Sequence, residues 1–88
     1  MTVLRIEDSA LRHGLTREDI SHAYDLALLD KVLDEVADPP KILIVGPDGA
    51  GNLLELIGGE LQGGDVIWHA MKCRKQYLDL LPGPGGEQ

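Results

Sequence analysis

The sequence predicts an α+β domain in which two N-terminal helices precede a small antiparallel sheet of three to four strands and a C-terminal helix. Two segments near the N-terminus carry apolar residues at helical spacing. Three short apolar runs, separated by glycine-rich turns, follow in the second half of the chain. We expect a single domain over residues 1–81 and a disordered Pro/Gly tail over residues 82–88.

The first helix is expected at about residues 6–13, because Ile6, Ala10 and His13 share one helical face. Gly14 follows at a position that commonly terminates a helix. A short strand over residues 2–6 is the alternative interpretation.

Thr16 is expected to open the second helix, since it is a good N-cap and Asp19 stands three residues later. A stripe at i, i+3, i+4, i+7 and i+8 spacing then predicts a face directed at the core. The stripe consists of Ile20, Ala23, Tyr24, Ala27 and Leu28. His22 lies off this stripe and is expected at the surface.

Residues 29–37 fit either a continued helix or a short edge strand, and we favour the strand. Asp38-Pro39-Pro40 ends either element. The strands of a meander are expected at residues 41–45, 53–57 and 65–70, joined by glycine-rich loops.

The C-terminal helix is expected at about residues 71–81, with Cys73, Tyr77, Leu80 and Leu81 on one face. The cations Lys72 and Lys75 lie away from that face. They stand near the start of the helix, which is the unfavourable end of its dipole for positive charge.

The negative net charge argues against non-specific binding of nucleic acids. Fifteen Asp and Glu residues against eight Lys and Arg residues give a net charge of −7, which repels phosphate backbones. Contact with RNA would therefore be confined to a local basic patch. Such a charge is also ordinary for a soluble protein.

Composition bounds the cofactors and the compartment. A single cysteine excludes an internal disulfide and a multi-thiolate zinc site, and we expect no metal and no cofactor. The apolar runs are far shorter than the ~20 residues of a membrane span. The first residues lack the apolar segment of a signal peptide. We expect a cytoplasmic protein that does not enter a membrane. Its small core makes a homodimer or a partner protein plausible.

The segment Val66–Leu78 is the densest group of cationic and titratable side chains in the chain. His69 fits either a hydrogen-bonded histidine at a sheet end or a general acid or base. The cations Lys72, Arg74 and Lys75 fit either a solvated helix face or an anion site, for which an arginine offers the bidentate fork. Cys73 has cationic neighbours, although its apolar face favours a plain core residue.

Four motifs in this order resemble the BrnT toxins of bacterial type II toxin–antitoxin systems, which have a RelE-like fold. They are Ser9-Ala-Leu-Arg-His-Gly-Leu, Glu18-Asp-Ile-Ser-His-Ala, Ile44-Val-Gly-Pro-Asp-Gly-Ala-Gly-Asn-Leu-Leu-Glu and His69-Ala-Met-Lys-Cys-Arg-Lys-Gln-Tyr-Leu. The resemblance covers about residues 9–81. This chain departs from those toxins in having His69-Ala-Met in place of a basic Ser-Ala-Arg type sequence, and in its acidic net charge.

The resemblance implies an endoribonuclease that is neutralised by an antitoxin protein and cleaves RNA through attack of the 2′-hydroxyl. It implies that His69 acts as base or acid, that Arg74 and Lys72 hold phosphate, and that Tyr77 assists. The candidate catalytic residues are His69, Arg74 and Tyr77, and the candidate substrate-binding residues are Lys72, Lys75 and Arg12. The alternative is a catalytically inactive toxin-like module that dimerises or binds a partner protein.

Overall fold

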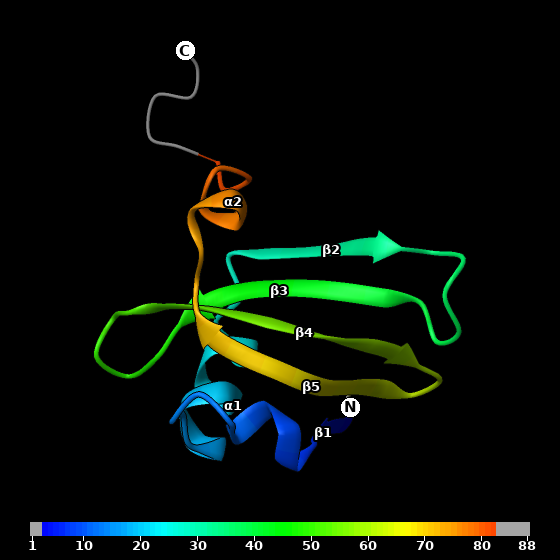
Figure 1. The fold of residues 1–88 in the computed structure, drawn as a ribbon, viewed down its shortest axis with the longest axis horizontal. Coiled ribbons are helices and arrows are strands. Elements are labelled where there is room, and N and C mark those ends of the chain that lie inside the picture. Colours follow the sequence, from blue (N-terminus) through cyan, green and yellow to red (C-terminus); the bar gives the residue numbers. More distant parts are fainter. Residues whose placement is uncertain (1–2, 83–88) are drawn as a thin grey trace.

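A five-stranded mixed sheet with the strand order β1-β5-β4-β3-β2 forms the centre of the molecule (Figure 1). The computed structural model describes residues 3–82. The strands are β1 (Val3–Ile6), β2 (Leu29–Asp34), β3 (Lys41–Pro47), β4 (Leu53–Leu61) and β5 (Gly64–Lys72). The helical elements are the 3₁₀ helix η1 (Asp8–Leu11) and the α-helices α1 (Arg17–Asp25) and α2 (Lys75–Leu78). Except for Pro82, the predicted tail lies outside the described residues.

The predicted arrangement of two N-terminal helices, three or four antiparallel strands and a C-terminal helix is wrong. Within residues 3–82, α1 is the only helix of seven or more residues. The expected first helix is replaced by β1 and η1. β1 runs parallel to β5, with Val3 opposite Gly64, so the sheet is mixed and has five strands. Leu4 and Ile6 alternate toward the core with period two, as the alternative strand interpretation requires.

α1 begins as the sequence predicts and ends earlier. Thr16 caps the helix, and its side chain and that of Asp19 form a reciprocal capping box. Ile20 and Ala23 are buried, whereas Ala27 and Leu28 lie beyond the helix and are exposed. The chain leaves the helix there because the Leu28 amide donates to Val45, next to the start of β2.

The antiparallel meander and the edge strand are confirmed, with longer strands than expected. β2 pairs with β3 alone, β3 pairs with β4, and β4 pairs with β5. The predicted helix over residues 71–81 is wrong at both ends, because only Lys75–Leu78 is helical. β5 continues to Lys72, which pairs with Leu54, and the Cys73 amide still donates to Leu53. Pairing with the long strand β4 satisfies these backbone groups, so α2 begins only at Lys75.

The two faces of the sheet are covered unequally. α1 and η1 cover one face, where the larger hydrophobic cluster lies. Its fully buried members include Ile20, Ile44, Leu54, Leu56 and Ile67. The opposite face carries a smaller cluster of Leu43, Val45 and Ile57, against which Tyr77 and Leu81 pack. No helix in the described part of the chain is long and apolar enough to cross a membrane.

A β-bulge in β5 decides which face His69 occupies. His69 lies opposite Ile57, whereas Ile67 lies opposite Gly58, so Trp68 is the extra residue. A strand with regular alternation would place His69 on the same face as Ile67, but Ile67 points into the larger core. The bulge instead places His69 on the face of Ile57 and the smaller cluster.

Gly58→Ala is expected to lower the free energy of unfolding by about 2 kcal/mol, because the added methyl group overpacks the strand opposite the bulge. A β-carbon at Gly58 would lie 1.7 Å from the carbonyl oxygen of Val66, which is backbone and cannot rotate away. Urea unfolding followed by circular dichroism measures the change. Gly49→Ala is the matched control, since a β-carbon there meets nothing within 4 Å. Equal stabilities of the two variants would contradict this account of the bulge.

Candidate functional site

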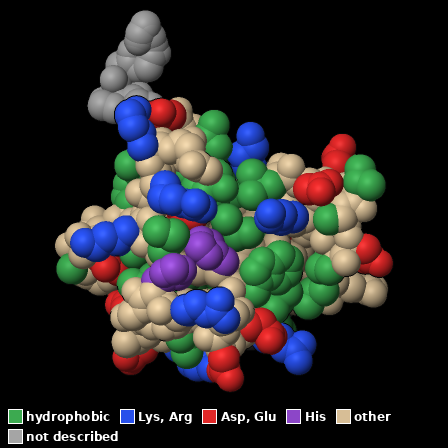
Figure 2. Space-filling model, in the orientation of Figure 1, with side chains coloured by type: hydrophobic (Ala, Val, Ile, Leu, Met, Phe, Trp, Pro, Cys, Tyr) green, Lys and Arg blue, Asp and Glu red, His purple; other side chains and the backbone are tan. Residues whose placement is uncertain are grey.

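An open pocket of about 480 Å³ lies where η1, β5 and the start of α2 meet. It is lined by Ser9, Arg12, His13, Lys41, Ile57, Trp68, His69, Arg74 and Tyr77. Figure 2 shows histidine side chains lying together on this face, with Lys and Arg side chains around them. A second hollow of about 530 Å³, between β1 and the β4–β5 turn, contains no histidine and one Lys or Arg side chain, Arg5. The histidine-bearing pocket is therefore the candidate site.

Glu55 is a buried carboxylate that contacts two residues of this site, Arg74 and His69. Its side chain is fully buried, yet it lies in the apolar run Leu53-Leu54-Glu55-Leu56-Ile57. One carboxylate oxygen accepts hydrogen bonds from the backbone amide of Arg74 at 2.9 Å and from Arg74 Nε at 3.0 Å. The other carboxylate oxygen accepts a hydrogen bond from Arg74 Nη2 at 2.7 Å and lies 2.9 Å from His69 Nε2. These contacts let a buried charge persist, because its hydrogen-bonding capacity is used.

Two opposing effects set the pKa of Glu55. Burial raises it, but hydrogen bonds from the side chain and backbone of Arg74 and from His69 outweigh burial. The net pKa of Glu55 is therefore below its ordinary value, and Glu55 is a carboxylate at neutral pH. The hydrogen bonds between the Arg74 side chain and Glu55 raise the pKa of Arg74, which stays a cation.

His69 reaches Glu55 because of the bulge at Trp68. The bulge turns the His69 ring to the side of Glu55 and Ile57, and 27% of the side chain remains exposed. The hydroxyl of Ser9 donates to the carbonyl oxygen of Trp68 at 2.7 Å. This bond fastens η1 to the bulged strand, so that the loop after η1 lies over His69.

That loop brings His13 and Arg12 to the pocket. The His13 and His69 rings meet edge to face, with their centroids 5.6 Å apart. Gly14 follows with a φ of 86°, a conformation that favours glycine and turns the chain toward α1. Two imidazoles from distant parts of the sequence thus share one wall of the pocket.

The pocket is cationic within an acidic protein. Arg12, Lys41 and Arg74 line it, and the single buried carboxylate of Glu55 is already paired with Arg74. The Arg74 guanidinium also lies 5.4 Å from the centroid of the Tyr77 ring, an arrangement that holds both side chains in place. An anion entering this pocket meets fixed positive charge, although the whole chain carries −7.

The structure brings together some of the sequence-predicted site residues and separates others. His69, Arg74, Tyr77 and Arg12 line one pocket. Lys72 and Lys75 do not line it; Lys72 is exposed at the end of β5. Lys75 forms an ion pair with Asp79 at 3.1 Å.

Sequence reasoning missed Glu55, His13 and Lys41 as site residues. A single acid within five residues that are otherwise Leu and Ile is the signal that marks Glu55. The spacing of Ile6, Ala10 and His13 predicts only a helical face for His13, and the apolar run after Lys41 predicts only that Lys41 begins a strand. Neither residue has a local signal, because each reaches the pocket through tertiary packing.

Cys73 directly precedes Arg74 in the chain. Burial and the nearby Glu55 carboxylate raise the pKa of Cys73, so its thiol is not activated by the cations beside it. Cys73 packs against the smaller hydrophobic cluster, as a core residue would. Among residues 3–82, no group of three or more His, Cys, Asp or Glu side chains is placed to hold a metal ion.

Comparisons with protein-family models, with curated proteins and with solved structures found no match. The function is therefore inferred from the residues of the pocket. The pocket has two histidines, one of which is oriented by Glu55, and fixed cations beside them. This arrangement suits proton transfer at an anionic centre, with one ring accepting a proton and the other donating one.

Proposed function

We propose that the protein is an endoribonuclease that cleaves RNA by attack of a 2′-hydroxyl on the adjacent phosphate. The observation that carries this proposal is the pairing of His13 with His69 inside a cationic pocket. The reaction needs a base for the hydroxyl proton, an acid for the leaving oxygen and positive charge around the phosphorane. The pocket offers a candidate for each requirement.

The bonds change in one displacement. One imidazole takes the proton of the 2′-hydroxyl, and the 2′-oxygen forms a bond to phosphorus. The bond from phosphorus to the 5′-oxygen breaks, and the second imidazole gives its proton to that oxygen. Arg74 and Lys41 stabilise the negative charge on the non-bridging oxygens. The products are a 2′,3′-cyclic phosphate and a free 5′-hydroxyl.

The biological setting is part of the same proposal. The resemblance of four motifs to BrnT toxins supports a role as the toxin of a type II toxin–antitoxin pair, acting in the cytoplasm and bound by an antitoxin protein. The net charge of −7 disfavours phosphate contact by the chain as a whole, which supports RNA contact at this cationic pocket.

Incubation of the purified protein with a single-stranded RNA and with DNA of the same sequence tests the proposal. We expect cleavage of the RNA alone, because DNA lacks the attacking hydroxyl. Expression of the wild-type protein in bacteria, without a partner, is expected to arrest growth. Intact RNA at high protein concentration, together with unimpaired growth, would exclude the enzyme.

Charge reversal of the pocket cations is expected to weaken RNA binding. The double variant Arg12→Glu, Lys41→Glu should reduce the slope of log affinity against log salt concentration by about two, one for each lost phosphate contact. Fluorescence anisotropy with a labelled RNA at several salt concentrations measures this slope. The matched control is Lys72→Glu, Lys75→Glu, which changes net charge equally outside the pocket. If both double variants lowered the slope equally, the pocket would not be the binding site.

We propose a protein-binding edge at β2 as a second function, compatible with the first. β2 pairs only with β3 in the described structure, and its residues Val32 and Leu33 are 43% and 36% exposed. An edge strand offers unpaired backbone groups to which another strand can be added. An antitoxin is the proposed occupant, and a homodimer is the other. A monomer by light scattering at high concentration, with no co-purifying protein, would count against this function.

A further inference from the structure

Glu55 makes contacts that go beyond neutralising an arginine. Its two carboxylate oxygens are contacted by the backbone amide, Nε and Nη2 of Arg74 and by His69 Nε2, all within 3.2 Å. The side chain is fully buried, and the carboxylate is therefore held in one orientation. Arg74 holds the carboxylate from one side, and the imidazole of His69 meets it from the other.

This geometry determines which ring nitrogen of His69 carries the proton. A carboxylate only accepts hydrogen bonds, so the contact at 2.9 Å requires a hydrogen on Nε2. In the neutral ring, Nδ1 then holds the lone pair. Among the described residues, the contact with Glu55 is the only hydrogen bond of the His69 ring, so Nδ1 has no competing partner.

We propose that Glu55 is a positioning residue that fixes the Nε2–H tautomer of His69 and thereby makes Nδ1 of His69 the proton acceptor of the reaction. This inference rests on the proposed ribonuclease function for its chemical consequence, but the tautomer itself does not depend on activity. It also assigns the two histidines, which the reaction alone leaves interchangeable.

The assignment makes His13 the proton donor. His13 is the other imidazole of the pocket, so once His69 accepts the 2′-hydroxyl proton, His13 is the ring left to protonate the 5′-oxygen. With ring centroids 5.6 Å apart, the two imidazoles repel each other when both carry a proton. One neutral ring and one protonated ring is the arrangement that the displacement needs. Nδ1 of His69 receives the 2′-hydroxyl proton, and His13 delivers its proton to the 5′-oxygen.

Two-dimensional NMR that correlates the ring nitrogens of histidine with their carbon-bound hydrogens tests the tautomer directly. We expect the neutral ring of wild-type His69 to be the Nε2–H form, because Nε2 faces the Glu55 carboxylate at 2.9 Å. A neutral His69 that carries its proton on Nδ1 would overturn the proposal. This measurement uses the wild-type chain, so it does not depend on whether any variant folds.

Glu55→Gln then tests the consequence. The amide has one acceptor oxygen and adds donors, so it cannot hold both Arg74 and the Nε2–H of His69 as the carboxylate does. We expect a mixture of His69 tautomers and a fall in kcat of about 10²- to 10⁴-fold, with KM changed far less. Glu60→Gln, at an exposed position outside the pocket, is the matched control and should change neither. A Glu55→Gln variant that folds and keeps full kcat would overturn the positioning role.

The NMR measurement and the cleavage assay distinguish failure of this inference from failure of the proposed function. Failure of the wild-type protein to cleave any RNA, with His69 in the Nε2–H form, would reject the ribonuclease and keep the assignment of the tautomer. Cleavage of RNA by a protein with His69 in the Nδ1–H form would keep the ribonuclease and reject Glu55 as its positioning residue.

Discussion

His69→Ala is expected to slow RNA cleavage by about 10²- to 10⁴-fold, the range over which a positioned acid or base contributes. His13→Ala should have an effect of the same order, because the displacement needs both a proton acceptor and a proton donor. The double variant should lose little more than either single variant, since the two groups act in one step. Single-turnover cleavage of a labelled RNA measures all three rates.

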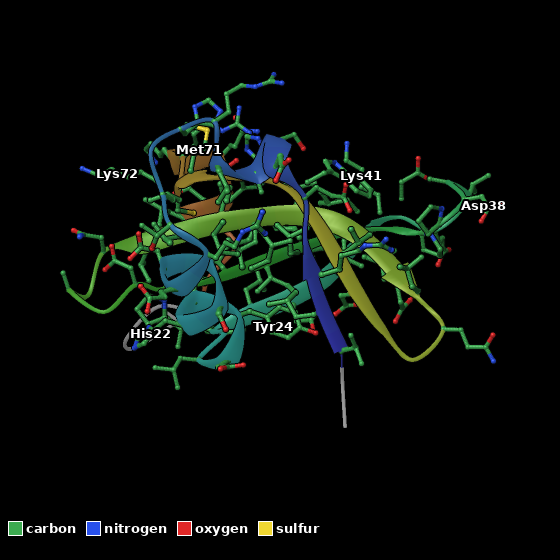
Figure 3. All side chains as sticks on the ribbon, turned by 90° about the horizontal axis from the view of Figure 1, so that it is seen from below. His22, Tyr24, Asp38, Lys41, Met71 and Lys72 are labelled. Carbon is green, nitrogen blue, oxygen red and sulfur yellow. The ribbon has the colours of Figure 1, made fainter. Side chains whose placement is uncertain are left out.

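The chain provides its own control for this experiment. His22 is the third histidine and lies on α1, where its Nδ1 is 2.7 Å from the carbonyl oxygen of Pro47. Figure 3 shows His22 on the side of the molecule away from Lys41 and Met71. His22→Ala should cleave RNA at the wild-type rate. Equal losses in all three single variants would point to a folding defect and would contradict the assignment of the pocket.

Glu55→Gln is expected to lower the free energy of unfolding by about 3 kcal/mol at neutral pH, because four donors lose a buried anionic partner. For a domain of this size, that change corresponds to a fall in Tm of roughly 15 °C. Thermal unfolding followed by circular dichroism measures it. Glu60→Gln is exposed and should change stability by no more than about 0.5 kcal/mol.

The stability difference should depend on pH in one direction. The pKa of Glu55 is lower in the folded protein than its ordinary value of 4.5. The ionised carboxylate therefore stabilises the fold fully above that value, and this contribution is lost as the pH falls through the folded pKa. Glutamine does not titrate, so the wild-type and Glu55→Gln curves should converge in acid. A constant difference at every pH would show that the carboxylate charge is not the stabilising feature.

Local signals in the sequence were sufficient to predict some elements. Thr16 and Asp19 form the capping box within one turn, so the start of α1 could be predicted. Strands β3, β4 and β5 follow from short apolar runs between glycine-rich loops. These features depend on residues close to one another in the chain.

Elements that depend on distant pairing could not be predicted in the same way. β1 exists because residues 3–6 pair with residues 64–67, and nothing near Val3 in the sequence encodes that partner. The segment after Ala70 has helical spacing, but pairing of Lys72 with Leu54 holds it in β5. Tertiary pairing therefore overrides the local helical pattern.

The residues of the candidate site also differ in whether neighbouring residues in the sequence predict them. His69, Arg74 and Tyr77 could be predicted as a group because they stand within nine positions of one another. Glu55 carried a local signal in its apolar run, but its partners come from β5 and the start of α2. The bulge at Trp68 also reversed the face of His69, and that reversal depends on the backbone opposite Gly58.

The chemistry of the RNA ends is the most direct test of the central claim that this pocket cleaves RNA through its 2′-hydroxyl. A defined RNA is incubated with the wild-type protein, and mass spectrometry identifies the product termini. The pocket predicts a 2′,3′-cyclic phosphate with a 5′-hydroxyl, and no cleavage where a single 2′-deoxy nucleotide replaces the attacking residue. Products with a 3′-hydroxyl and a 5′-phosphate, or cleavage at the 2′-deoxy position, would contradict the account.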